Sequence, residues 1–199
     1  MGERRLIQKL KSGDADACRQ FVQTHYAGIF RMLARLTRDS HRAEDLCQET
    51  FAAAWAKIGA FSEQCALGTW LHRIAYRRFV DWTRARKNQA ADSLGNDPIE
   101  HDNPLASALK NERQRSLLAG LDQMEELDRH VLVLRYLQQM RFKEIAAILE
   151  QPERTLRWRA GIALQRLRRI LEKEQDVQQR NQSGARASAP AVAGDSARA

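Results

Sequence analysis

The sequence predicts an all-α protein: two small helical domains joined by a flexible linker. Apolar residues recur every three or four positions along most of the chain, as they do on one face of an α-helix. No segment alternates apolar and polar residues over the length of a strand. Residues 88–111 are rich in Asn, Asp, Ala and Ser, with little periodicity before Leu105, which is typical of a linker.

The charge distribution indicates contact with a polyanion. The 199 residues carry a net charge of +8. Basic residues outnumber acidic ones by 16 to 9 in residues 1–87 and by 11 to 9 in 121–174, whereas acidic residues lead by 5 to 3 in 88–120. Two basic blocks around an acidic connector favour a protein that grips a nucleic acid at two points. The alternative is an ordinary solvated surface.

Several functional classes find no support. The three cysteines lack a C-x-x-C motif and a histidine at metal-ligand spacing, which fits a reducing cytosol and argues against disulfides or zinc. The N-terminus has no apolar segment of the signal-peptide kind, and no apolar run approaches the ~18 residues of a membrane span. Glycine-rich phosphate loops and nucleophile motifs are absent. We therefore expect a cytoplasmic protein that has no cofactor or metal, does not insert into a membrane and is not an enzyme.

Four helices are predicted in the first domain, residues 1–87. Asp14 begins the second helix, Asp39 or Ser40 is expected to cap the third, and Thr69 is expected to cap the fourth. Glycines punctuate the loop before that fourth helix. The predicted helices cover residues 4–11, 14–37, 42–58 and 69–87.

The third and fourth of these helices carry opposite charge. Asp45, Gln48 and Glu49 share a face of the third helix away from its apolar stripe, and are left for solvent or a partner. The fourth helix has six basic residues against Asp81 alone, together with several aromatic residues. This contrast suggests two different partners, one basic and one a nucleic acid.

Residues 112–174 are predicted to form a second domain with a helix-turn-helix. A short helix (residues 141–150), a turn containing Pro152 and a long basic helix are typical of that motif. A helical hairpin with a solvated basic face is the alternative. The inward-facing residues are expected to be Leu127, Val131, Leu134, Tyr136 and Leu137 before the motif, and Leu156, Ala160, Ala163, Leu164, Leu167, Ile170 and Leu171 in the long helix. The tail, residues 175–199, is low in complexity, and we expect it to be disordered.

Three segments, in this order, resemble the bacterial sigma-70 family: AEDLCQETFAAAW, TWLHRIAYRRFVDWTR and KEIAAILEQPERTLRWR. The resemblance is to the small group 4, or extracytoplasmic function (ECF), sigma factors, which keep only regions 2 and 4. It covers roughly residues 14–87 and 117–172. It implies a region 2 helical bundle, a region 4 helix-turn-helix, and an alternative sigma factor that directs RNA polymerase to a subset of promoters.

The resemblance also implies roles for individual residues. Asp45, Gln48 and Glu49 match the motif that docks on the β′ clamp helices of core RNA polymerase, whose β subunit is a further contact. The −10 element would be read and melted by Arg73, Tyr76, Arg77 and Arg84, because cations beside aromatic rings suit captured single-stranded bases. The −35 element would be read by Arg154, Arg157, Trp158, Arg159 and Ile162.

Two of the residues implied to read DNA depart from the family pattern, and one further partner is implied. Arg77 stands where family members often have asparagine, and Trp158 replaces a residue that is usually small and polar. Members of this group are usually held by a cognate anti-sigma factor, so one is expected. The competing hypothesis is a stand-alone helix-turn-helix regulator that binds duplex DNA as a dimer. It would explain residues 121–172 but not the acidic face or the basic, aromatic helix.

Overall fold

The computed structural model describes residues 2–92 and 112–187, and the side chains of residues 2–89 and 115–173. Within these ranges every regular element is a helix, as predicted. The expected linker, residues 88–111, overlaps the end of helix α4 at its first five residues, and residues 93–111 lie outside the described ranges. None of the described helices is both long enough and apolar enough to cross a membrane.

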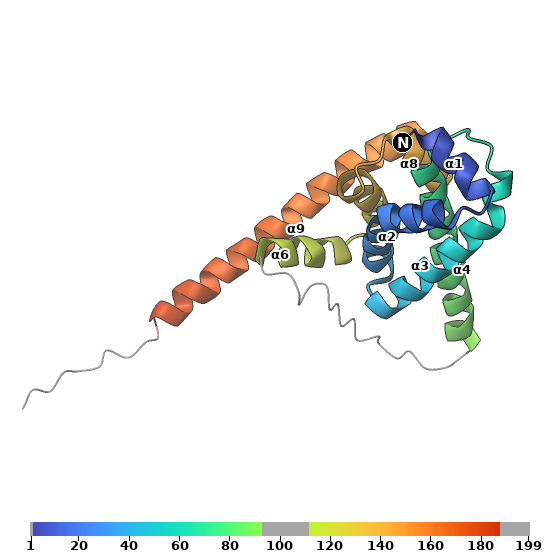
Figure 1. The fold of residues 1–199 in the computed structure, drawn as a ribbon. Helices are drawn as coiled ribbons and strands as arrows, with labels where there is room; N and C mark the ends of the chain where they lie inside the picture. The colour runs from blue at the N-terminus through green and yellow to red at the C-terminus, as the bar shows by residue number, and fades with distance from the viewer. Residues whose placement is uncertain (1, 93–111, 188–199) are drawn as a thin grey trace, which may run out of the picture.

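The N-terminal half consists of α1 (Glu3–Lys11), α2 (Ala15–Thr37), α3 (Ser40–Lys57), the short 3-10 helix η1 (Ile58–Ala60) and α4 (Leu67–Asp92). Figure 1 shows α2, α3 and α4 packed side by side, and contacts among these three helices dominate this half.

Side-chain caps account for where α2 and α3 begin. The Asp14 carboxylate accepts a hydrogen bond from the backbone N–H of Ala17 at 2.8 Å, and Asp39 accepts one from Arg42 at 3.0 Å. The expected cap at Thr69 is wrong. α4 begins two residues earlier, and Thr69 lies buried within its first turn, where its hydroxyl donates to the Glu144 carboxylate at 2.8 Å.

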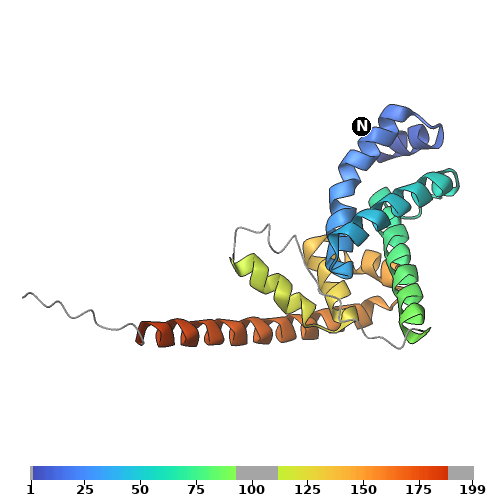
Figure 2. The same ribbon diagram turned by 90° about the horizontal axis from the view of Figure 1, so that it is seen from below.

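The C-terminal half consists of α6 (Glu112–Asp122), α7 (Glu126–Leu132), the π-helix η2 (Val133–Leu137), α8 (Phe142–Leu149) and α9 (Glu153–Ala187). α8 and the start of α9 form the predicted helix-turn-helix, with Glu150 in the left-handed conformation that ends α8. Figure 2 shows α9 extending well beyond the other helices. It runs through residues 175–187, part of the segment expected to be disordered.

Three residues expected to face inward are exposed instead. Tyr136 is 49% exposed and Leu137 is 40% exposed. Both lie in the π-helix, where Gln138 N–H bonds to the carbonyl of Val133, five residues back. That wider turn breaks the 3.6-residue periodicity on which the expectation rested. Leu164 is 39% exposed because it lies at the edge of the apolar stripe of α9.

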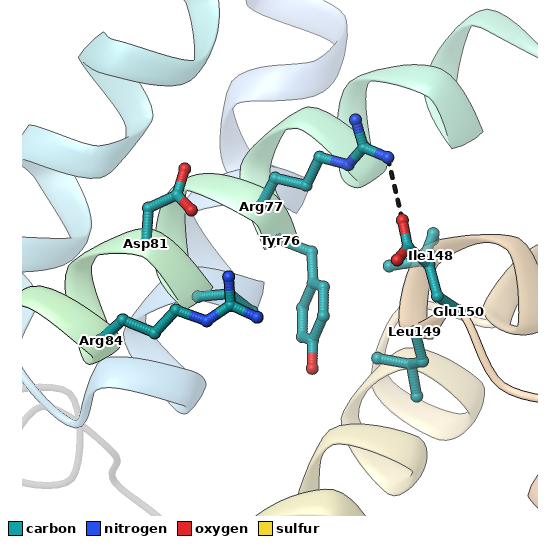
Figure 3. Close-up of a pocket in the computed structure, with 8 residues that line it drawn as sticks. Tyr76, Arg77, Asp81, Arg84, Ile148, Leu149 and Glu150 are labelled. Carbon is teal, nitrogen blue, oxygen red and sulfur yellow. Dashed lines mark hydrogen bonds and ion pairs between the residues drawn. The ribbon is translucent and has the colours of Figure 1, made fainter.

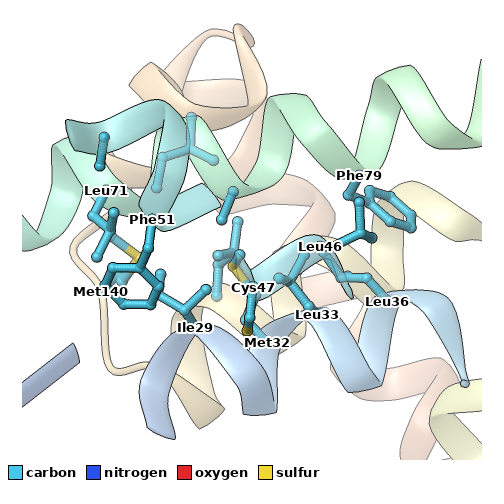
Figure 4. Close-up of a cluster of buried hydrophobic side chains, with 14 of the residues drawn as sticks. Ile29, Met32, Leu33, Leu36, Leu46, Cys47, Phe51, Leu71, Phe79 and Met140 are labelled. Carbon is cyan, nitrogen blue, oxygen red and sulfur yellow. The ribbon is translucent and has the colours of Figure 1, made fainter. Parts of the chain in front are cut away.

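The two halves share one hydrophobic core. Its buried residues include Ile29, Leu46 and Leu71 from the N-terminal half, and Leu134 and Met140 from the C-terminal half. Figure 4 shows Met140 beside residues of α2, α3 and α4. A second, smaller cluster joins α6, α7 and α9 through Leu118, Leu121, Met124, Leu132, Ala163 and Leu167. The halves are therefore packed against each other through buried side chains.

Candidate nucleic-acid interface

The acidic residues of α3 lie on its solvent side. Leu46, Cys47 and their apolar neighbours are buried, whereas Asp45, Gln48 and Glu49 are exposed. Arg42 lies 3.4 Å from the Asp45 carboxylate and 3.7 Å from that of Glu49. These partly exposed pairs contribute little stability, but they orient two carboxylates toward the same side of the helix. The structure thus brings the three predicted polymerase-binding residues together on an open surface.

Arg42 links this acidic surface to the basic helix α4. Its guanidinium group lies 5.6 Å from the centre of the Trp82 ring, and Arg86 lies over the same ring at 5.5 Å. Two cations over one indole gain from the ring's electron-rich face and fix the position of the tryptophan. Trp70 and Trp82 pack against the hydrophobic core while remaining partly exposed.

The residues predicted to contact the −10 element follow α4 along two hollows. Tyr76, Arg77 and Arg84 line a groove of about 410 Å3 between α4 and the end of α8 (Figure 3). Arg73 lines a separate hollow of about 400 Å3, which Arg77 also borders. Arg77 therefore borders both hollows, whereas Arg84 borders only the first and Arg73 only the second.

Two further cations of the second hollow were missed from the sequence. Lys57, at the end of α3, and Arg78 both line it beside Arg73. Lys57 ends a helix whose exposed carboxylates are Glu44, Asp45 and Glu49, so its place against α4 depends on how α3 and α4 cross. The N-terminal half therefore presents four basic side chains around this hollow, counting Arg77, with Asp81 as its acidic member.

Tyr76 is already engaged by the C-terminal half. Its hydroxyl lies 3.1 Å from Nδ1 of His130, and the two rings meet edge to face with their centres 5.6 Å apart. Burial raises the pKa of Tyr76 to about 12, so the hydroxyl keeps its proton at physiological pH. Phe79, the neighbouring aromatic residue, is 2% exposed and belongs to the core.

The first turns of α9 present a basic surface with one large aromatic residue. Arg154, Arg157 and Trp158 are exposed, Trp158 by 65%. Arg157 donates through Nε to the Glu153 carboxylate at 3.0 Å, and its guanidinium lies 4.9 Å from the centre of the Phe142 ring. Both contacts fix the direction of the Arg157 side chain.

Arg159 lies apart from that surface. It donates to the buried Asp128 carboxylate at 2.9 Å and reaches Glu125 at 3.0 Å, while Arg166 contacts the other Asp128 oxygen at 2.9 Å. These contacts tie α9 to α7, so Arg159 positions the helix. Ile162 is half-buried in the same region of α9.

Asp128, the buried carboxylate that ties α9 to α7, was missed by reasoning from the sequence. The sequence did contain a signal. Asp128 lies three positions before Val131 and four before Leu132, so it shares the apolar face of its helix with them. Arg159 and Arg166 are seven apart, so they share a face of α9 and can reach one carboxylate.

No cluster of metal-binding side chains occurs among the described residues. Burial raises the pKa of Cys47 to about 12, so this thiol stays protonated and unreactive.

The fold has two helical halves, and the second contains a helix-turn-helix. This architecture is that of all-α DNA-binding proteins.

Comparison with known proteins identifies the family. The family model of Sigma-70 region 2 matches residues 21–89, and that of Sigma-70, region 4 matches residues 114–171. Together these matches cover more than half of the chain, which therefore belongs to the sigma-70 family, in its ECF group.

Individual relatives agree with this assignment. The ECF RNA polymerase sigma factor SigW of Bacillus subtilis (strain 168) is 27% identical over 180 residues, covering 83% of this chain and 94% of that protein. The ECF sigma factor SigE of Mycolicibacterium smegmatis is 31% identical over 158 residues, covering 77% of this chain and 61% of that protein. The sigma factor RpoE of Bartonella quintana, solved with the anti-sigma factor NepR, has a similar fold, with a TM-score of 0.64 and 22% identity over 77% of this chain and 96% of that one.

Proposed function

We propose that this chain is an alternative sigma factor, which binds core RNA polymerase and directs it to a subset of promoters. The acidic surface of Asp45, Gln48 and Glu49 docks on the β′ clamp helices. The −10 element is opened along α4, and the −35 element is read by the start of α9. The chain contributes binding and DNA melting in the cytoplasm and has no catalytic role of its own, because the polymerase forms the phosphodiester bonds.

One observation carries this proposal above the others. The N-terminal half presents carboxylates on α3 and arginines on α4, and Arg42 and Trp82 connect the two surfaces. A protein that only gripped DNA would gain nothing from exposed carboxylates beside its DNA-binding cations, because they repel phosphates. A protein that binds a basic partner protein and DNA together needs both.

Within the region 4 half, Arg154, Arg157 and Trp158 are the proposed contacts to the −35 element. They are exposed at the start of α9, the part of a recognition helix that enters the major groove. Arginine can bond both O6 and N7 of guanine, and an indole can contact a thymine methyl group. Arg159 is proposed to hold α9 in place through Asp128.

We further propose that an anti-sigma factor holds this chain. The support is the RpoE–NepR complex, a sigma factor of similar fold solved with its anti-sigma factor. No observation favours the alternative of a stand-alone dimeric regulator, which leaves the acidic surface of α3 without a purpose.

The proposal is tested by transcription with purified components. Core RNA polymerase is mixed with the chain and with genomic DNA fragments, and run-off transcripts are mapped. We expect initiation at discrete start sites that share an upstream motif. The opposite result would be transcription no higher than that of core polymerase alone, together with dimerisation of the chain on duplex DNA. That result would favour the stand-alone dimeric regulator.

A further inference from the structure

Helix α1 contacts both ends of the loop, residues 61–66, that leads into α4. At the start of the loop, the Lys11 ammonium group donates a hydrogen bond to the carbonyl oxygen of Phe61 at 2.8 Å. At its end, the Glu3 carboxylate accepts one from the backbone N–H of Leu67, the first residue of α4, at 2.7 Å. A charged residue at each end of α1 therefore fixes one end of the loop.

α1 is itself anchored by apolar side chains. Ile7 and Leu10 are 3% and 2% exposed, and both belong to the large hydrophobic core cluster. Burial of these two aliphatic side chains holds α1 in place without help from its charged ends. Replacing Glu3 or Lys11 should therefore release the loop while α1 stays packed on the core.

The loop has a backbone conformation that needs support. Ser62, Glu63 and Gln64 are exposed, and Glu63 has a φ of +57°, in the left-handed region that residues other than glycine rarely adopt. The Glu63 carboxylate lies 3.9 Å from Nε of Arg4, but this pair is too exposed to contribute much. The two charge-assisted hydrogen bonds at the ends of the loop are therefore the stronger contacts that α1 makes with it.

Both ends of the loop are connected to the second hollow of α4. The Phe61 ring packs against the ring of Trp70, with centres 5.0 Å apart, and Trp70 lines that hollow together with Arg73. Leu67 begins the helix that carries Trp70 and Arg73 in its first two turns. A shift of either end of the loop would therefore move the wall of the hollow.

We propose that Glu3 and Lys11 are positioning residues, through which α1 shapes the second hollow for the captured −10 strand. Glu3 fixes the first residue of α4, and Lys11 fixes Phe61 and, through its ring, Trp70. Neither residue has to touch the strand. This inference rests on the proposed function, because it assumes that the hollow receives the strand. It adds a role for a helix that lies before residue 21, where the match to the region 2 model begins.

The negative charge of Glu3 makes the expected effect easy to recognise. Removing a carboxylate makes the chain more positive, and by electrostatics alone a more positive chain binds a polyanion more tightly. A positioning role predicts weaker binding, because Glu3→Ala removes the acceptor that holds Leu67. Glu3→Gln loses the same charge but keeps an oxygen that can accept the Leu67 N–H, so it separates the effect of charge from that of the hydrogen bond.

The first arm of the test measures strand binding by core RNA polymerase carrying this chain. The probe is a fluorescent single strand of about 12 nucleotides, with the non-template −10 sequence of a promoter mapped in the transcription assay. We expect Glu3→Ala to weaken binding about three- to ten-fold, as loss of one hydrogen bond would, and Glu3→Gln to stay within about two-fold of the wild type. Asp16→Ala removes an exposed carboxylate from α2 and, as the control, should not weaken binding.

Lys11 is tested in the same assay against a second exposed cation of α1. Lys11→Ala and Arg5→Ala each remove one positive charge from this helix, and of the two only Lys11 donates to the loop. Lys11→Ala should therefore weaken strand binding more than Arg5→Ala does. Lys11→Arg keeps a donor for the Phe61 carbonyl and should recover most of the affinity. Every variant should co-elute with core polymerase and keep its helicity by circular dichroism.

The second arm measures the loop itself, by amide hydrogen exchange in the free chain. Peptides covering residues 61–70 should exchange faster in Glu3→Ala than in the wild type, because the Leu67 N–H loses its acceptor. Peptides covering residues 46–54 of α3 should exchange at the same rate in both. This result does not depend on what the hollow binds.

Four results would overturn the inference. One is strand binding by Glu3→Ala as tight as that of the wild type or tighter, as charge alone predicts. Another is equal loss in Lys11→Ala and Arg5→Ala, and a third is unchanged exchange at residues 61–70. The fourth is loss of co-elution by Glu3→Ala, since α1 would then support the whole N-terminal half.

Failure of the proposed function would look different. A wild-type chain that initiates transcription with core polymerase but binds no strand would remove the −10 assignment together with this inference. A wild-type chain that binds the strand, with Glu3→Ala binding it equally well, would remove the inference alone.

Discussion

The hydroxyl of Tyr76 lies 3.1 Å from Nδ1 of His130, across the junction between the two halves of the chain. Burial, and secondarily the charge of Arg129, lowers the pKa of His130 from 6.5 to about 3. The Glu126 carboxylate, 3.9 Å from Nε2, is half-exposed and too distant for a hydrogen bond, so it offsets little of this. His130 is therefore neutral in the folded chain, and this has a consequence for stability.

We predict that the chain becomes less stable as the pH falls below about 6.5. Below pH 6.5 His130 is protonated in the unfolded chain, whereas in the folded chain it stays neutral down to about pH 3. The free energy of unfolding therefore decreases as the pH falls from 6.5 to 3. At pH 5 this single site costs about 2 kcal/mol. Burial also lowers the pKa of His25 and His72, which act in the same direction. Urea unfolding at pH 7 and pH 5 measures the difference.

The matched variants for this prediction are His130→Asn and His41→Asn. His41 is exposed on α3, so its replacement removes a histidine without touching the junction. His130→Asn should flatten the pH dependence, leaving the smaller slope from the other two histidines. An unchanged slope in His130→Asn would mean that this buried imidazole is not the group responsible.

Asp128 should be the residue on which the region 4 half depends most. Its carboxylate is nearly inaccessible and binds Arg159 and Arg166 at 2.9 Å each. Asp128→Asn removes the charge and leaves Arg159 partly buried without its main partner, which we expect to cost about 2 kcal/mol in the free energy of unfolding. Asp16→Asn, at an exposed pair on α2, should change it by less than about 0.5 kcal/mol.

Arg159 and Arg157 should behave differently when each is replaced by alanine. Arg159→Ala is expected to lower the unfolding free energy and to weaken duplex binding without changing which sequence is preferred. Arg157→Ala should leave stability nearly unchanged and weaken binding to the −35 element by about 1–3 kcal/mol, with lost preference at one base pair. Competition binding with single-base variants of that element measures the affinity and the base preference, and urea unfolding measures the stability. A uniform loss for Arg157→Ala would make it a phosphate contact.

The helices, and the exposure of the candidate binding residues on α3 and α9, follow from local sequence. The apolar spacing along α3 fixes which side is buried, and Asp45, Gln48 and Glu49 follow onto the open side. The basic turn of α9 is exposed for the same reason. Predictions of this kind succeed because each needs only one helix and its own periodicity.

What the sequence did not reveal depends on contacts between distant residues. The junction joins Tyr76 to His130 and Arg77 to Glu150, and neither pair has a spacing that marks it as a contact. The π-helix was missed for a different, local reason: one wider turn leaves no mark in the apolar spacing, yet it turns Tyr136 and Leu137 outward where a regular helix would bury them. Thr69 was predicted to be a cap, but its hydroxyl binds Glu144. This partner lies 75 residues later in the chain, so the local sequence does not indicate the contact.

The most direct measurement of the central claim is binding to core RNA polymerase. Wild-type chain, Asp45→Arg, Glu49→Arg and the control Asp16→Arg, which reverses an exposed charge on α2, are each mixed with core polymerase and separated by gel filtration. We predict co-elution of the wild type and the control, and loss of co-elution by both α3 variants with unchanged helicity by circular dichroism. Retained binding by Asp45→Arg and Glu49→Arg would contradict the docking assignment, and absence of binding by the wild type would contradict the sigma-factor function itself.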